Sequence, residues 1–226
     1  MCTKRFAILS FLPVLFIANI ASAATEVPVK ARLYVGATSV NPTSLNDVIQ
    51  TQGMAKMDSV THYGVDITYP VLPFLDLGVR YTKHLGDKQE DPSNSATDYY
   101  TKIDQDSVAL VARVPLLKTD ILRADIFGGF GGSNTTVKLK NSAQDGELTK
   151  KADSGWFATP YSVAGASVGI GWKHFFVFFE GGIESNKVDG FSRTGTTSSN
   201  ITNLDLSGGY FSLGIFMDGI PGTIGK

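Results

Sequence analysis

A serine flanked by glycines is the first feature of this sequence whose residue types could do chemistry. Gly165-Ala166-Ser167-Val168-Gly169 matches the G-x-S-x-G pattern of hydrolases, in which a sharp turn between a strand and a helix exposes a nucleophilic serine. Here a strand-like alternation continues through Trp172, so the sequence predicts no such turn. We therefore expect no catalytic role for Ser167 and interpret the segment as small residues packed inside β structure.

The three histidines, His62, His84 and His174, are candidates for metal binding or for general-base chemistry. None is spaced as a metal-binding pair, although two imidazoles near the outer ends of adjacent strands, at His62 and His84, could bind a metal. We favour solvated histidines at loop edges and predict no metal and no cofactor. A lipid-deacylating site needs a histidine and a serine on one face; Ser59 is near His62, but on the other face if the strand extends that far.

Charged residues of mixed sign also stand at alternate positions within otherwise apolar stretches: Arg32, Asp66, Asp76, Arg80, Arg123, Asp125 and Glu180. Unpaired ions are costly in a confined space that holds little water, so opposite charges that share such a space are expected to pair. Whether these seven share one space depends on the elements that carry them.

The first 23 residues are typical of a secretory signal peptide, which leaves residues 24–226 as one domain. Lys4 and Arg5 precede a mostly apolar run over residues 6–20, and Ala21-Ser22-Ala23 supplies the small residues of a cleavage site. The run is shorter than the about 20 residues that span a bilayer as a helix. Cleavage there removes Cys2, the single cysteine, so we expect neither a disulfide nor a cysteine-based site.

Composition narrows the class of protein. With 18% charged residues, 11% aromatic residues and 24 glycines, the chain is typical of glycine-rich β structure rather than of a disordered chain or a helical bundle. The formal net charge is −1, so the basic surface that binds phosphate backbones is missing. Nucleic acid is therefore not an expected partner.

Period-2 alternation of apolar and other residues dominates the mature chain. In Val29–Ala37 the odd positions are apolar and the even ones charged, aromatic or glycine, which places the two sets on opposite faces of a strand. Further strands are predicted near residues 62–69, 75–84, 107–114, 122–131, 161–173, 175–184 and 210–217. Short connections at residues 70–74, 115–120 and 173–174 alternate with long polar ones, which predicts an all-β fold, an eight-stranded antiparallel up-and-down transmembrane β-barrel.

The two faces of these strands differ in kind. The apolar face carries no charge, whereas the other face carries many glycines, the seven charged residues above, and also Lys30 and Arg113. A barrel of about eight strands has an interior just wide enough for side chains to fill, so glycine there makes room for larger neighbours. We therefore predict an apolar face toward lipid and a lumen filled by a charge network, which we favour as a plug over a gated pathway. A wide pore needs about 16 to 18 strands.

Several segments resemble the strands of the small outer-membrane β-barrel superfamily of Gram-negative bacteria, which includes the OmpA transmembrane domain, OmpX and OmpW. They are Phe127–Gly132, Val168–Lys173, Phe178–Gly182 and Ser207–Ile215. The resemblance covers the whole mature chain and is one of pattern. It implies a place in the cell outer membrane, with outer-membrane lipid, lipopolysaccharide and the barrel assembly machinery as partners. The chain departs from the pattern at its non-aromatic C-terminus, so an assembly signal would lie internally, near residues 212–217.

The long connections are a second candidate site, for an extracellular partner. Asn41–Ser44 predicts a turn and helix cap, followed by a short helix with Leu45, Val48 and Ile49 on one face. Val137–Lys140 and Gly146–Lys151 could extend the barrel as a hairpin above the membrane. Near them, Trp156 and Phe157 could touch lipid headgroups or a partner.

From these patterns we expect a structural or surface-interaction role without catalysis. The alternatives are a narrow channel for small or apolar solutes, similar to the OmpW type, and a lipid A-modifying enzyme. A soluble, lipocalin-like binding module would require the face assignment to be reversed.

Overall fold

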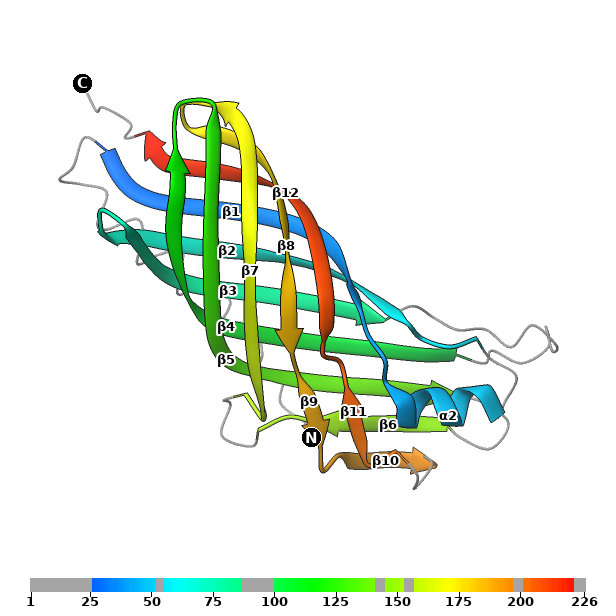
Figure 1. Cartoon of the computed structure of the whole chain (residues 1–226). Coiled ribbons are helices and arrows are strands. Elements are labelled where there is room, and N and C mark those ends of the chain that lie inside the picture. The colour runs from blue at the N-terminus through cyan, green and yellow to red at the C-terminus, as the bar shows by residue number, and fades with distance from the viewer. Residues whose placement is uncertain are drawn as a thin grey trace.

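Eight long strands close into a barrel (Figure 1). The structure, a computed structural model, describes residues 26–51, 55–86, 100–140, 145–152, 157–196 and 201–221. The strands are β1 (Glu26–Ser39), β2 (Ser59–Leu72), β3 (Leu75–Gly86), β4 (Tyr100–Lys118), β5 (Leu122–Lys140), β7 (Thr159–Trp172), β8 (Phe175–Ser185) and β12 (Gly208–Pro221). All pairings are antiparallel, and the β1–β12 and β5–β7 pairs complete the ring. The predicted fold class is confirmed.

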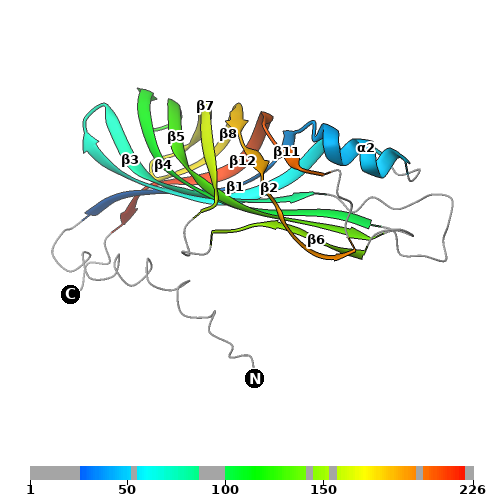
Figure 2. The same ribbon diagram turned by 90° about the horizontal axis from the view of Figure 1, so that it is seen from below.

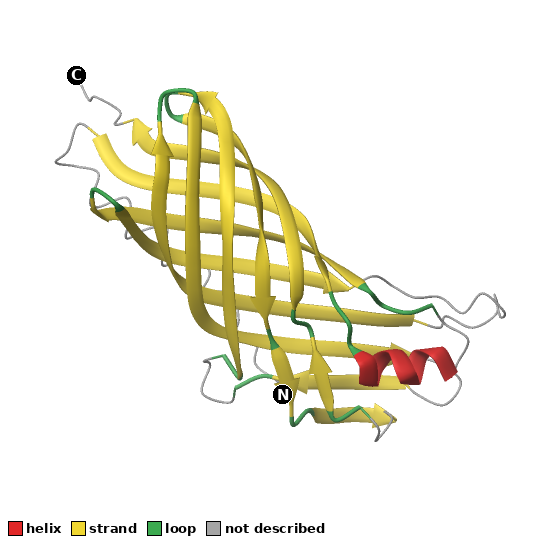
Figure 3. Ribbon diagram, in the orientation of Figure 1, coloured by secondary structure: helices red, strands yellow, loops and turns green. Residues whose placement is uncertain are grey.

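The two ends of the barrel are built differently. At one end, short turns join β2 to β3, β4 to β5 and β7 to β8; in the last, Lys173 takes a left-handed φ of 54°. At the other end lie α2 (Thr43–Thr51), β6 (Asp145–Lys150), β9 (Lys187–Asp189), β10 (Ser192–Thr196) and β11 (Asn203–Asp205). Figure 2 shows α2 and β6 at this loop end, and Figure 3 marks α2 as the helix among the strands. Among the described residues, no helix is long and apolar enough to cross a membrane.

Several strands are longer than the sequence predicts. β4 and β5 stay paired up to Tyr100 and Lys140, β6 pairs with the loop-end part of β5, and β10 pairs with β6. β12 likewise continues to Pro221. The prediction stopped where outward positions become polar, because alternation in hydrophobicity marks only the part of a strand that has one apolar face. The predicted hairpin of residues 137–140 with 146–150 is confirmed.

The face assignment is confirmed by burial. Outward side chains such as Leu110 and Trp172 are 72% and 73% exposed, whereas the inward Arg80 and Arg113 are 2% and 1% exposed. The barrel therefore has an apolar outside and a charged inside, the reverse of a soluble protein.

Inward glycines make room for large side chains, as at Gly64. A Cβ there would collide with the Tyr34 hydroxyl and the Tyr81 carbonyl. The Tyr34 hydroxyl donates to that carbonyl at 3.0 Å. The missing Cβ thus lets the Tyr34 side chain lie over β2 and reach β3.

We expect Gly64→Ala to lower the free energy of unfolding by about 1–3 kcal/mol, because the added methyl group must displace Tyr34 or the backbone. Gly128→Ala is the matched control, since a Cβ at this outward glycine would meet no atom within 4 Å. Urea unfolding in lipid vesicles measures both changes. Equal losses at the two positions would show that strand glycines matter only through backbone entropy.

Candidate functional site

Arg113 on β4 is the hub of a buried ion-pair network in the middle of the lumen. Its Nε donates to Asp66 Oδ2 at 3.0 Å, its Nη1 to Asp125 Oδ1 at 2.7 Å, and its Nη2 to Glu180 Oε2 at 3.0 Å. Nη2 also donates to Asp66. The three carboxylates come from β2, β5 and β8, so one guanidinium joins strands around the whole ring.

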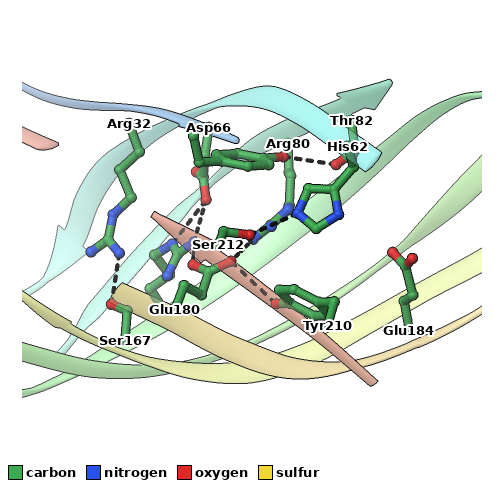
Figure 4. A network of polar contacts seen from close by, with 12 residues as sticks. Arg32, His62, Asp66, Arg80, Thr82, Ser167, Glu180, Glu184, Tyr210 and Ser212 are labelled. Atoms are coloured by element: carbon green, nitrogen blue, oxygen red, sulfur yellow. Dashed lines mark hydrogen bonds and ion pairs between the residues drawn. The ribbon is translucent and has the colours of Figure 1, made fainter. Parts of the chain in front are cut away.

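Two further arginines complete the network (Figure 4). Arg32 donates to Asp125 and, at 2.8 Å, to the Ser167 hydroxyl. Arg80 Nη1 lies 2.7 Å from Glu180 Oε1. Three guanidinium groups, on Arg32, Arg80 and Arg113, thus face three carboxylates, on Asp66, Asp125 and Glu180, all of them buried. The opposite charges balance, which is what allows so many ions to share a space without bulk water.

Aromatic rings fill the space between the arginines. The guanidinium of Arg80 lies 4.4 Å from the Tyr34 ring centroid, and that of Arg113 lies 4.1 Å from the Phe127 centroid. These are cation–π distances, and the planar guanidinium group suits them better than a lysine ammonium does. The middle of the lumen is therefore packed as well as charge-balanced.

The charged residues predicted to line the lumen form two groups, one in the middle of the lumen and one near the short turns. Arg32, Asp66, Arg80, Asp125 and Glu180 lie in the central network.

Nearer the short turns, Asp76 pairs with Lys30, and Arg123 pairs with Asp218 at 2.9 Å. The sequence assigns Arg113 to the inward face but not to the charge network, whereas in the structure Arg113 is the residue that connects the network. Its position is set by register, since Arg113 stands opposite Asp76 on β3 and Phe127 on β5.

The histidines His62 and His84 correct the expectation of solvated loop-edge side chains. Both are buried inside the lumen, 2% and 1% exposed, because strands β2 and β3 continue past them. They stand opposite each other in register with ring centroids 5.6 Å apart. His84 Nε2 lies 3.0 Å from Glu184, which also accepts a hydrogen bond from the Tyr161 hydroxyl at 2.9 Å.

A serine–histidine contact was missed by the sequence reasoning. Ser212 on β12 lies 2.7 Å from His62 Nε2, and His62 Nδ1 lies 3.0 Å from the Thr38 hydroxyl. Ser212 and His62 are 150 positions apart, so only the closure of β12 onto β1 brings them near each other. The pair faces inward and is buried, with Ser212 fully inaccessible, so a lipid outside the barrel does not reach it.

Ser167, the serine of the G-x-S-x-G match, lies within the uninterrupted strand β7. Its side chain points into the lumen and accepts its hydrogen bond from Arg32. Because β7 continues past Ser167, the strand-to-helix turn that the motif requires is not present at this residue. Across the described residues, no group of three or more His, Cys, Asp or Glu side chains is arranged to hold a metal ion.

An apolar core closes the loop end of the lumen. It contains Val40, Leu45, Ile49, Met57, Val60, Ile103, Val137, Leu139, Leu148, Val188, Ile201, Leu204 and Leu206. The predicted helix is confirmed as α2, which buries Leu45 and Ile49 completely. Asn46 fixes its position by donating to the Met57 carbonyl at 3.0 Å and accepting from the Met57 N–H at 2.8 Å. This apolar core together with α2 forms the cap of the barrel.

The small sheet of β9 and β11 forms the other side of the cap. Burial would raise the pKa of Asp205, but hydrogen bonds from Ser207 and the nearby Lys187 outweigh it, so the pKa lies below its usual value. A pocket of about 410 Å³ lies between this sheet and Thr43 and Ser44 of α2. Of the two aromatic residues proposed for a loop contact, Phe157 is half-buried and Trp156 lies outside the described residues.

The outer surface carries an apolar belt bounded by charge. Exposed apolar side chains cover the outer face of every barrel strand, among them Leu33, Leu77, Leu110, Phe130, Ile170, Phe179 and Phe211. Toward the loop end the outer face becomes charged, where Lys83 bridges Asp104 and Asp106 and the Tyr81 hydroxyl donates to Asp106 at 2.6 Å. An apolar belt outside a closed ring with a polar interior is the arrangement of a barrel in lipid.

The chain is a closed, eight-stranded antiparallel β-barrel with an apolar outer belt.

The chain was compared with protein families, curated proteins and solved structures. No protein-family model and no curated protein matches the chain. Ail, the attachment invasion locus protein of Yersinia pestis, aligns with a TM-score of 0.44 and 11% identity over 83% of this chain and 97% of its own. The outer membrane protease OmpT from Escherichia coli aligns with a TM-score of 0.41 and 10% identity over 87% of this chain and 99% of its own. The outer membrane protein OprG from Pseudomonas aeruginosa aligns with a TM-score of 0.39 and 11% identity over 86% of this chain and 97% of its own.

Proposed function

We propose that this outer-membrane β-barrel is a closed, non-enzymatic scaffold that holds an ordered extracellular end for contacts at the cell surface. The observation that carries the proposal is the filling of the lumen. From the short turns toward the loops, the lumen contains the Lys30–Asp76 and Arg123–Asp218 pairs, the Arg113 network, the paired His62 and His84, here called the histidine layer, and the cap.

The cap supports a surface role for the loop end. A loop that only joined two strands would need no apolar core of its own, whereas this end has a helix docked by its apolar face, a small sheet and the β6–β10 extension. Loops held by a rigid scaffold are where binding residues are usually placed. The buried position of Ser212 and His62 argues against a lipid-editing site on the outer face.

Planar-bilayer recording tests the closed lumen. We expect the reconstituted protein to give no unitary current steps, because ion-paired side chains and the cap occupy the path. A heat-induced shift in gel mobility in SDS shows that the sample tested is a folded barrel.

Current steps in the wild-type protein that change with Glu180→Gln or Arg80→Ala would contradict this proposal. They would support the narrow channel, since both side chains lie in the lumen.

A further inference from the structure

The histidine layer lies directly beneath the cap. His62 on β2 and His84 on β3 stand opposite each other in register. The next inward positions toward the loops are Val60, which belongs to the apolar core of the cap, and Gly86. A Cβ at Gly86 would lie 3.1 Å from the sulfur of Met57, another core residue. The two layers are therefore in contact, and a change of charge in the histidine layer acts on the cap.

The hydrogen-bond partners of His62 in the described residues are two hydroxyl groups (Figure 4). Its Nε2 lies 2.7 Å from Ser212 Oγ and its Nδ1 lies 3.0 Å from Thr38 Oγ1. A hydroxyl group donates or accepts, so these contacts suit a neutral imidazole, which has one donor and one acceptor. They offer no negative charge to a protonated ring. Because His62 is buried, water does not stabilise that charge either.

The other rings of this layer belong to tyrosines. Tyr34 on β1 and Tyr210 on β12 lie with their ring centroids 6.1 and 5.7 Å from that of His62. Tyr161 on β7 lies 6.4 Å from His84 by the same measure. A phenol is uncharged until the pH approaches about 10, so these three rings do not neutralise an imidazolium.

The lumen offers the layer one carboxylate for two imidazoles. The charged groups near enough to act on His62 are Arg80, Glu180 and Glu184. Glu180 lies 2.7 Å from Arg80 and 3.0 Å from Arg113, so the central network uses its charge. Glu184 lies 3.0 Å from His84 Nε2. It balances one proton on the layer, and among the described residues no carboxylate is left to balance a second.

We infer that the histidine layer is a pH-sensitive switch that keeps the cap docked at neutral pH and releases it in acid. Under the docked cap, a second proton places an uncompensated charge beside Arg80. When the cap opens, water reaches His62, which then becomes protonated below a pH of about 6.5, as histidine does in water. The open form thus binds more protons than the closed form, so acid favours opening. The switch does not depend on what the cap contacts at the cell surface.

Hydrogen–deuterium exchange of the full barrel in lipid nanodiscs at pH 7.5 and pH 5.0 tests the switch, after correction for the intrinsic pH dependence of amide exchange. One imidazole that is neutral under the closed cap and titrates near pH 6.5 in the open form raises the open population about 30-fold over this interval. We expect that acceleration in residues 43–51 of α2, with residues 164–172 of β7 unchanged. Equal protection of α2 at the two pH values would overturn the switch.

His62→Gln removes the proton acceptor and keeps a side chain that both donates and accepts. We expect its α2 to exchange equally at the two pH values. His174→Gln is the matched control, because His174 lies at the short-turn end, where its Nδ1 is 2.8 Å from the Asp218 carbonyl oxygen. This variant should keep the wild-type response to acid. An unchanged response in His62→Gln, or a lost one in His174→Gln, would overturn the assignment to the histidine layer.

Glu184→Gln tests the charge count independently, including the case in which His62→Gln loosens the cap at both pH values. It removes the carboxylate that balances the first proton, so a closed cap then disfavours both protons. We expect a steeper response to acid than in the wild-type protein, because opening takes up one more proton. A response no steeper than that of the wild-type protein would contradict the switch.

Discussion

Arg113→Met is expected to lower the free energy of unfolding by about 3–5 kcal/mol, because it leaves buried carboxylates without their cation. Asp66 is affected most, since its ion-pair and hydrogen-bond partner in the described residues is Arg113. Methionine keeps much of the volume, so the loss reports charge rather than a cavity. Urea unfolding in lipid vesicles, followed by the gel shift on heating, measures it.

A double variant separates this explanation from a general packing defect. Asp66→Asn in the Arg113→Met background removes one uncompensated charge, so we expect it to recover part of the lost stability. Lys138→Met is the surface control; it breaks the Lys138–Glu147 pair, whose side chains are 45% and 39% exposed, and should produce no measurable change. A double variant less stable than Arg113→Met alone would refute the charge-balance account.

Ile49→Asp is expected to release α2 from the cap while the barrel stays closed. Ile49 is fully buried in the apolar core, and an unpaired carboxylate there costs several kcal/mol. Undocking the helix exposes the charge to water and avoids that cost. Hydrogen–deuterium exchange should then accelerate about 100-fold or more in residues 43–51, with β2 and β3 still protected.

Gln50→Asp controls for the new charge itself. Gln50 lies on the exposed side of the same helix, so the carboxylate remains in water and exchange should match the wild-type protein. Equal acceleration in the two variants would mean that helix propensity, and not burial in the cap, keeps α2 in place. Loss of the heat-induced gel shift in Ile49→Asp would mean that cap and barrel fold as one unit.

The sequence by itself determined the fold, the inner and outer faces and α2. Each of these depends on local periodicity: alternation at period 2 assigns Leu110 to lipid and Arg80 to the lumen, and helical spacing puts Leu45 and Ile49 on one face. It also assigned all six charged residues of the central network, Arg113 included, to the inward face, because inward positions can be counted along each strand.

Only the tertiary structure decided which of these side chains meet. Arg32 and Asp125 are 93 positions apart, and His62 and Ser212 are 150 apart. Their contacts depend on the register of each strand pair and on two pairings that complete the ring, β1 with β12 and β5 with β7. The second of these joins strands that are separated in the sequence by β6. The pattern along one strand determines which face a side chain is on, but it does not determine the register against neighbouring strands. For this reason the central role of Arg113 and the buried histidine layer could not be predicted.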